Sequence, residues 1–478
     1  MVVGTGRKVG TSTIAQGLLI ALKRAGLSVA VGKVGPDIVD TTHHRRISGR
    51  LTHSLDLWML SAEQLNHCLC RLSGGAEFIL LEGQSGIFDN YPSDYAVKLE
   101  AEVASMLGTP VVLVVDGRGY AESIAALVRG FASYQKNFPI AGVIVNWVRD
   151  DAHNKLLRAA IEGQGGVRYL GGVPVGDPMM ISGAQVAGAE ENPSLLTRNR
   201  VMAVGDLVQK AIDLTAIREV AKTATPLPTT KAILAGLPRR CRIAVADDAA
   251  FHLTFQDNLD LIRRAGAELV AFSPLADIKL PSDAGGLYLP NAYMTLYAAD
   301  LEANEAIRTA IREFANAGGA IYAEGGAVAY LCKRLVAPGG EKYTMVGLIP
   351  GTATAVNTTN ENVETMYCEI TAREETVITR IGDKFRGMRE SKWLVRLEEK
   401  VLNCFQMRDR RVLLDQNQRD TPPAMEGLSP LPHVIATTIV PHWGSNPRMA
   451  TMFVDAVTAS LPTLSSKIRA KDGEKTSS

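Results

Sequence analysis

A glycine-rich segment near the start of the chain carries residue types that can bind phosphate. It reads Gly4-Thr5-Gly6-Arg7-Lys8-Val9-Gly10-Thr11-Ser12-Thr13, and we expect it to join a short strand to a helix. The backbone N–H groups of such a loop, together with the N-terminus of the following helix, can hold phosphate oxygens. Ser12 adds a hydroxyl of the kind that binds Mg²⁺ beside a bound phosphate.

One residue of this phosphate-binding motif is missing. A phosphate loop normally places Lys directly after its last glycine, where the ammonium group neutralises phosphate charge. Thr11 stands at that position, although Arg7 or Lys8 could supply a cation from elsewhere in the loop. A glycine turn that binds no nucleotide is therefore an equally open interpretation.

Parallel βαβ units are expected to position this loop. Up to about Val220, short β-branched runs alternate with helical stretches, which is typical of a parallel sheet. The helix from Ser12 to Ala25 has apolar residues at helical spacing, as expected if it packs on the sheet. The expected strands are Val2–Val3, Val29–Val34, Phe78–Glu82, Pro110–Asp116 and Ile140–Asn146.

The pattern predicts an α/β protein with two domains, because 478 residues are too many for one core. Residues 1–223 form the first domain, a parallel sheet of the phosphate-loop type. Residues 224–240 contain three prolines and little periodicity, so we interpret them as a linker. Residues 241–464 form a second, doubly wound domain, and the polar residues 465–478 are expected to be a disordered tail.

The overall composition excludes several function classes. A net charge of +1 provides no general field for nucleic acid or an anionic membrane, so no partner of either kind is expected. The six cysteines have no repeated CxxC spacing and are expected to be reduced thiols. No signal peptide is recognisable and the apolar runs are too short to span a bilayer, which predicts a cytoplasmic protein.

Several motifs recur together in the order that one family shows. They include Lys33-Val34-Gly35-Pro36-Asp37, Glu82-Gly83, Gly86-Ile87-Phe88-Asp89, Val112-Leu113-Val114-Val115-Asp116 and Gly142-Val143-Ile144-Val145-Asn146. From Gly4 to about Leu461 the chain resembles the cobyrinic acid a,c-diamide synthases and their relatives that act on nickel-sirohydrochlorin or sirohaem.

The resemblance implies an ATP-dependent reaction in the first domain. In that family the domain binds MgATP, phosphorylates two peripheral carboxylates of a tetrapyrrole, and lets ammonia displace the phosphate. By position, Asp37 and Asp40 would lie near the γ-phosphate and the metal, and Glu82 would be a magnesium or phosphate-site carboxylate. Asn146 would contact adenine. Carboxylates at strand ends also serve as helix caps, which is the alternative role of each.

The resemblance also implies a glutaminase fold, of the class I glutamine amidotransferase kind, in the second domain. The family reads Ala-Glu-Cys-Gly-Gly at the strand-to-helix elbow that carries its nucleophile. This chain reads Ala323-Glu324-Gly325-Gly326-Ala327, so Gly325 replaces the cysteine. Cys332 is expected to lie about two helical turns further on, as a buried apolar residue.

Two further parts of the glutaminase site differ. The family's glycine-rich oxyanion loop is replaced by Pro290-Asn291-Ala292-Tyr293-Met294-Thr295, in which the proline lacks a backbone donor. Val440 replaces the catalytic His, and His442 matches a second His that we expect to be structural. We therefore expect no catalytic residue in this domain and no glutaminase activity.

Two functions remain open, and a third is disfavoured. The first is a non-catalytic protein that binds a tetrapyrrole or a partner subunit, as a homodimer or as a heterodimer with an intact relative. The second is an amidoligase that uses MgATP and externally supplied ammonia. A partitioning ATPase shares the phosphate-loop fold, but such proteins lack a second domain.

Overall fold

The computed structural model describes residues 1–89, 99–163, 166–176, 198–227, 236–356, 365–390, 392–409 and 422–475. Residues 228–235, the middle of the expected linker, lie outside the described residues. The chain divides into two compact units, Met1–Ile233 and Leu234–Ser478. Each unit has its own buried apolar clusters, so each is described by itself.

The first unit is built around a parallel sheet of seven strands in the order β3-β2-β4-β1-β5-β6-β7. Its strands are nearly continuous apolar runs, as in β5, because both faces of a parallel sheet are covered. All five strands expected from the sequence are present. The strands are β1 Val2–Gly4, β2 Val29–Val34, β3 His53–Leu55, β4 Phe78–Gly86, β5 Val111–Asp116, β6 Ile140–Val148 and β7 Arg168–Pro174.

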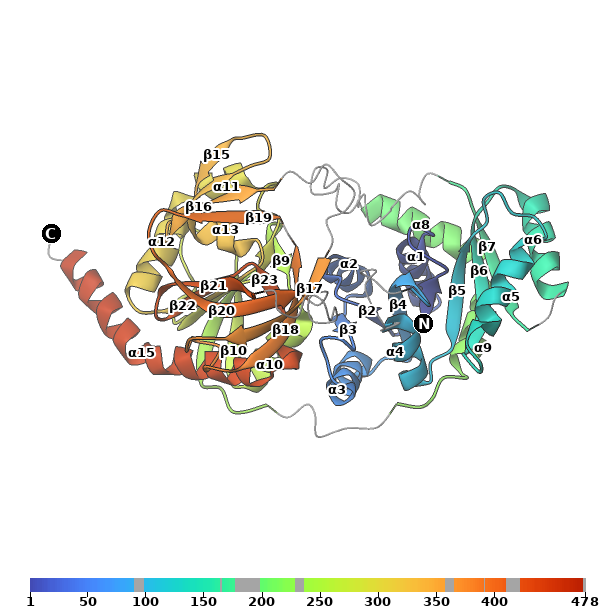
Figure 1. Cartoon of the computed structure of the whole chain (residues 1–478), viewed down its shortest axis with the longest axis horizontal. Coiled ribbons are helices and arrows are strands. Elements are labelled where there is room, and N and C mark those ends of the chain that lie inside the picture. The colour runs from blue at the N-terminus through green and yellow to red at the C-terminus, as the bar shows by residue number, and fades with distance from the viewer. Residues whose placement is uncertain are drawn as a thin grey trace. The chain divides into compact units, whose positions relative to one another are not determined.

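Helices follow the strands of this sheet, as the alternating pattern predicts (Figure 1). The apolar residues of α1 at helical spacing, such as Ile14 and Leu18, are fully buried. Helix α8 lies alongside α1. The described helices are α1 Thr11–Arg24, α2 Ile38–Ser48, α3 Ala62–Ser73, α4 Leu99–Leu107, α5 Ile124–Tyr134, α6 Asp151–Gly163, α8 Arg198–Ala211 and α9 Leu214–Ala221.

The second unit has a sheet of ten strands in the order β10-β8-β11-β13-β22-β21-β20-β17-β18-β23. Its first five strands are parallel and form the expected doubly wound part. The others pair antiparallel, an extension that the sequence pattern did not predict. The strands of this sheet are β8 Cys241–Ala246, β10 Ala267–Phe272, β11 Gly286–Leu289, β13 Ala320–Glu324, β17 Thr365–Ala372, β18 Lys384–Glu390, β20 Leu402–Asp409, β21 Ala424–Leu431, β22 Val434–Thr437 and β23 Ile439–Pro441.

Two smaller sheets and several helices complete the second unit. The strands are β9 Phe251–Leu253 with β12 Asn291–Ala292, and β14 Cys332–Val336, β15 Lys342–Thr344, β16 Ile349–Ala355 and β19 Trp393–Leu397. The helices are α10 Gln256–Arg264, α11 Ala298–Ala303, α12 Glu305–Asn316, α13 Ala327–Leu331, the 3₁₀ turn η6 Trp443–Ser445 and α15 Arg448–Lys475.

Two expectations about this unit are wrong. Helix α15 continues past residue 465 to Lys475, because the polar residues there extend an existing helix instead of leaving it. Helix α13 is only five residues long, so Cys332 begins strand β14 rather than lying on a later helical turn. The thiol is fully buried, as expected, and burial raises its pKa to about 12. No helix among the described residues has both the length and the apolar character that a bilayer crossing requires.

Candidate nucleotide site and glutaminase elbow

The glycine-rich segment joins the carboxyl end of β1 to the N-terminus of α1, the place where parallel sheets bind ligands. Gly10 is the N-cap residue, with φ of 88°, and offers no side chain to cap the helix. The first turn of α1 contains no acidic residue. Its N–H groups and the positive end of the helix dipole are therefore suited to an anion.

The Asn146 side chain holds this loop in place through hydrogen bonds. Its amide nitrogen donates to the carbonyl oxygen of Val9 at 3.0 Å, and its amide oxygen accepts from the N–H of Trp147. A Cβ atom on Gly10 would lie 2.2 Å from the same amide nitrogen, so the loop approaches Asn146 as closely as only glycine allows. Both ends of the Asn146 side chain are bonded to the chain itself, and its contact with adenine stays a prediction.

The other residues of the loop lie in different environments. The N–H of Thr5 donates to the Val114 carbonyl, which ties the loop to β5. Lys8 is exposed and has φ of 62°, a left-handed conformation that costs a non-glycine residue about 1–2 kcal/mol. Thr11 keeps its hydroxyl near Gly4: a Cβ on that glycine would lie 2.8 Å from the Thr11 Oγ1. Thr13 is buried behind the loop.

A buried cluster of charges lies beside the loop, formed by Ser12, Lys33, Asp40 and Glu82, and we call it the Lys33 cluster. Lys33 and Glu82 are register partners on the adjacent strands β2 and β4. The Lys33 Nζ lies 2.6 Å from the Asp40 Oδ2 and 2.5 Å from the Glu82 Oε1. The Ser12 hydroxyl contacts the same two oxygens, at 3.1 Å and 2.6 Å. Three of the four predicted metal-binding residues therefore come together.

The charges in this cluster shift each other's proton affinity. Burial alone would lower the pKa of Lys33, but the carboxylates of Asp40 and Glu82 more than offset it and hold that pKa well above its ordinary value. Burial would raise the pKa of Glu82, but Lys33 and His44 hold it well below its ordinary value. The His44 Nε2 lies 2.7 Å from the second oxygen of Glu82. Lys33 and Glu82 are thus held in their charged forms and are paired with each other.

Asp37, the fourth predicted metal-binding residue, caps a helix instead. Its Oδ1 accepts from the backbone N–H groups of Val39 and Asp40 at the start of α2. Burial, followed by the charge of Asp40, raises its pKa to about 6. Asp37 thus has the alternative role of a strand-end carboxylate, and it positions Asp40 by fixing the helix that carries it.

The oxygens of the Lys33 cluster are donors that Mg²⁺ prefers. The Lys33 ammonium contacts one carboxylate oxygen of Asp40 and one of Glu82. Lys33 was not among the site residues predicted from the sequence. The available signal was a single lysine in the otherwise apolar and fully buried strand β2.

The strand-to-helix elbow of the second unit lies between β13 and α13. Gly325 there has φ of 60°, and its N–H donates to the Thr437 carbonyl at the end of β22. The Asn291 Oδ1 accepts from the N–H of Gly326 at 2.7 Å and from the N–H of Ala292 at 3.0 Å. A Cβ on Gly325 would lie 2.4 Å from that oxygen. The Asn291 side chain therefore fills the space where a nucleophile would project.

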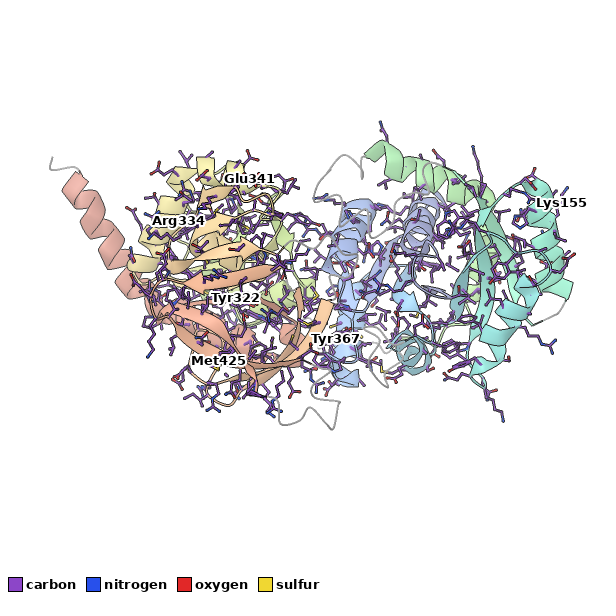
Figure 2. The ribbon with its side chains drawn as sticks, turned by 45° about the horizontal axis from the view of Figure 1, so that its top comes forward. Lys155, Tyr322, Arg334, Glu341, Tyr367 and Met425 are labelled. Atoms are coloured by element: carbon purple, nitrogen blue, oxygen red, sulfur yellow. The ribbon has the colours of Figure 1, made fainter. Side chains whose placement is uncertain are left out.

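A buried carboxyl group precedes the elbow. Glu324 accepts hydrogen bonds from the hydroxyls of Thr254 and Tyr288 on one oxygen and of Tyr322 on the other, each at 2.8 Å. Tyr322 lies among the strands of the second unit (Figure 2). Burial raises the pKa of Glu324 to about 7, although the three hydroxyls act in the opposite direction.

The positions aligned with the family's histidines are apolar or structural. Val440 is buried in β23 and is the register partner of Met388. The His442 Nδ1 accepts from the N–H of Gly444 and so caps the turn η6, and its ring packs against Phe255. The Nε2 of His442 lies 3.6 Å from the buried Asp257 carboxylate, and a purely structural role for His442 stays a prediction.

Family models match both units of the chain. Residues 1–180 match the CobQ/CobB/MinD/ParA nucleotide binding domain, and residues 242–382 match the CobB/CobQ-like glutamine amidotransferase domain. The fold and the site thus define a nucleotide-binding domain joined to a domain of the glutamine amidotransferase class.

Whole-chain relatives are more specific. A cobyrinate a,c-diamide synthase of Leptospira interrogans is 31% identical over 95% of this chain and 97% of its own length. One of Salmonella typhimurium is 35% identical over 86% of this chain and 89% of its own length. One of Methanosarcina acetivorans is 34% identical over 72% and 74%. The chain belongs to the cobyrinate a,c-diamide synthase family.

Proposed function

We propose that this chain is a member of that family that does not hydrolyse glutamine and that acts as a tetrapyrrole-binding or partner subunit. The observation that carries the proposal is the Asn291 amide oxygen, which accepts from the N–H groups of Ala292 and Gly326. One of these donors belongs to the replaced oxyanion loop and the other to the elbow.

Acyl transfer from glutamine needs N–H donors that are available for the oxyanion of the tetrahedral intermediate. Here the neutral Asn291 amide oxygen accepts hydrogen bonds from both N–H groups. Gly325 provides no sulfur, so no thioester can form, and buried Val440 cannot act as a base. The loss of the nucleophile, the base and the open donor pair each argue independently against hydrolysis.

Glutamate release from labelled glutamine tests the proposal, with an intact family member as the positive control. We expect no release by the wild-type chain or by the Gly325→Cys variant, because Asn291 overlaps the new side chain. Release by the wild-type chain that persists through repeated purification would refute the proposal. Release by Gly325→Cys alone would refute the blocking role of Asn291.

The family membership supports the proposed binding of a tetrapyrrole or of a partner subunit. The relatives are named for a reaction on cobyrinate, so we propose a corrinoid or related tetrapyrrole carboxylate as the ligand. Absorbance titration with cobyrinic acid should show saturable binding.

Co-expression with an intact relative, followed by size-exclusion chromatography, separates a heterodimer from a homodimer. Elution as a monomer without bound tetrapyrrole would contradict the proposal.

The Lys33 cluster favours a second candidate, an amidoligase that takes ammonia from outside. In this reaction a tetrapyrrole carboxylate oxygen attacks the γ-phosphorus of ATP and ADP leaves. Ammonia then attacks the acyl carbon, phosphate leaves, and the surplus proton passes to solvent. The retained Ser12, Asp40 and Glu82 support this candidate, whereas Thr11 opposes it.

Mass spectrometry of the tetrapyrrole after incubation with ATP, MgCl₂ and an ammonium salt tests this candidate. Conversion of carboxylates to amides by the wild-type chain would favour it over the non-catalytic role. The Thr11→Lys variant should convert faster, because it restores the missing phosphate-loop cation. No conversion by either protein would contradict the amidoligase.

A further inference from the structure

A bulge at the carboxyl end of β6 redirects the side chain of Trp147. Between Asn146 and Val148, β6 advances by two residues while its partner β7 advances by one, so Trp147 is the extra residue. Its φ of 57° is a left-handed conformation that is sterically costly for a large side chain. Bulges and strained residues recur beside binding sites, where they aim a side chain at a ligand. The surroundings of this indole ring therefore indicate what it could bind.

The ring lies against the phosphate loop and is half-buried. A Cβ on Gly10, the residue that precedes α1, would be 3.6 Å from the Trp147 Cζ2. Asn146 ties the two segments together, because its amide oxygen accepts from the N–H of Trp147 and its amide nitrogen donates to the Val9 carbonyl, each at 3.0 Å. The indole thus borders the loop at the edge where parallel sheets bind ligands.

Arg118 covers one face of the indole ring. Its guanidinium carbon lies 4.0 Å from the ring centroid, which is a cation–π contact. The Asp116 carboxylate fixes the guanidinium there, accepting from Nε at 3.1 Å on each oxygen and from Nη2 at 2.7 Å. No aromatic ring among the residues that the structure describes stacks on Trp147. The face opposite Arg118 is therefore the one on which a planar ligand would stack.

We propose that Trp147 is the base-binding platform of the nucleotide site. The purine ring of a nucleoside triphosphate stacks on the indole face opposite Arg118, while the loop before α1 holds the phosphates. The inference rests on nucleotide binding by the first unit, which the amidoligase candidate requires. The competing role is an indole that only packs on Gly10 and supports the loop, and such a role would affect phosphate binding as much as base binding.

Calorimetric titrations with ATP and with tripolyphosphate, both in MgCl₂, separate the base from the phosphates. Trp147→Ala should weaken ATP binding by about fivefold or more, because a base loses its stacking partner. The same variant should bind tripolyphosphate within about threefold of the wild-type dissociation constant. Trp147→Phe keeps an aromatic ring and should retain the ATP affinity within about threefold. Circular dichroism establishes that each variant folds.

Indole fluorescence provides a second readout. Emission of the wild-type chain should fall when ATP is added, because the purine stacks on the ring, and should not fall with tripolyphosphate. The chain has four tryptophans, so Trp147→Phe should abolish this change while still binding ATP in the calorimeter. Trp393→Phe is the matched control: it removes a half-buried tryptophan from β19 of the second unit and should preserve the change.

Equal weakening of ATP and tripolyphosphate binding by Trp147→Ala would overturn the inference and leave Trp147 as a support of the loop. Unchanged ATP affinity in that variant, or an ATP-dependent change of emission that survives Trp147→Phe, would also overturn it, and the nucleotide site itself would stand. Failure of the wild-type chain to bind ATP would contradict nucleotide binding as well as the inference.

Discussion

At the scale of single residues, two buried glutamates show that the neighbouring side chains determine whether the pKa of a buried carboxyl group is raised or lowered. Glu82 and Glu324 are both fully buried, Glu82 in the middle of β4 and Glu324 at the end of β13. Burial raises the pKa of each, but Lys33 and His44 reverse that effect for Glu82. Glu324 has only hydroxyl donors from Thr254 and two tyrosines, so its pKa stays raised, at about 7. A hydroxyl compensates a buried charge less than an ammonium does.

This difference predicts a pH dependence of stability that comes from Glu324. Its carboxyl has an ordinary pKa of 4.5 in the unfolded chain and a pKa of about 7 in the fold, so the folded state holds the proton more strongly between these values. The contribution of Glu324 to stability is therefore greatest at the acidic end of this window and falls as pH rises through it, by on the order of 3 kcal/mol. Denaturant unfolding across this window, compared with Glu324→Gln, measures the effect.

The Glu324→Gln variant should lack this dependence, because its amide does not titrate. The difference between the two unfolding free energies should then change across the window in the stated direction. Parallel curves for the two proteins would show that Glu324 has an ordinary pKa.

At the scale of elements, glycines decide how closely strands and helices approach. At the elbow between β13 and α13, Gly325 adopts a left-handed conformation and leaves room for Asn291. Between α1 and α8, Gly17 contacts Val208 and Gly205 contacts Ile20, so each helix approaches the other at a glycine. The helix that begins at the phosphate loop is thus positioned by α8 as well as by the sheet.

A double-mutant cycle tests the elbow. Gly325→Ala should destabilise the chain by more than the about 1–2 kcal/mol that a left-handed alanine costs, because its Cβ overlaps Asn291. In an Asn291→Gly background the same change should cost only the conformational part. We expect a coupling energy of about 0.5–3 kcal/mol between the two sites. Additive effects in thermal or denaturant unfolding would show that Asn291 does not fill the elbow.

A pair of glycine substitutions tests the helix contact. Gly17→Ala should lower the unfolding free energy by up to about 2 kcal/mol, because overpacking costs about 1–3 kcal/mol and alanine recovers about 1 kcal/mol of helix propensity. Gly130→Ala on the exposed face of α5 is the control, since its Cβ meets nothing within 4 Å. That variant should be more stable by up to about 1 kcal/mol. Stabilisation by both changes would contradict a close contact between α1 and α8.

At the scale of the whole molecule, the chain consists of two units that each bury their own core. The boundary between Ile233 and Leu234 falls inside the stretch 224–240 that the sequence marks as a linker. The Lys33 cluster belongs to the first unit and the blocked elbow to the second. The two sites therefore lie in different compact units of the chain.

Nucleotide binding should stabilise only the first unit. Differential scanning calorimetry with ATP at about 100 times its dissociation constant should raise the stability of one transition by about 2.7 kcal/mol. Hydrogen exchange should locate the protection within Met1–Ile233. An equal shift of both transitions would contradict independent units, and glutamine should shift neither.

The order of residues along the chain was enough to predict the alternation of strands and helices, because the spacing of apolar residues sets which faces are buried. It also led us to predict which site residues are missing, from Thr11 after the last loop glycine, Gly325 at the elbow and Val440 at the position expected for a histidine. These are properties of single positions, and no contact is needed to identify them. The same reasoning failed for the polar tail, where α15 continues to Lys475.

Which side chains meet in the Lys33 cluster and at the elbow could be learned only from the folded chain. Lys33 and Glu82 are 49 positions apart and meet because β2 and β4 are neighbours in register. Asn291 and Gly326 are 35 positions apart and meet because β12 leads past the elbow. Whether an ammonium or an amide oxygen occupies such a place depends on burial and on the partners that the fold brings within hydrogen-bonding distance. Burial and these contacts depend on segments that are distant in the sequence, so the spacing of residues along the chain does not predict them.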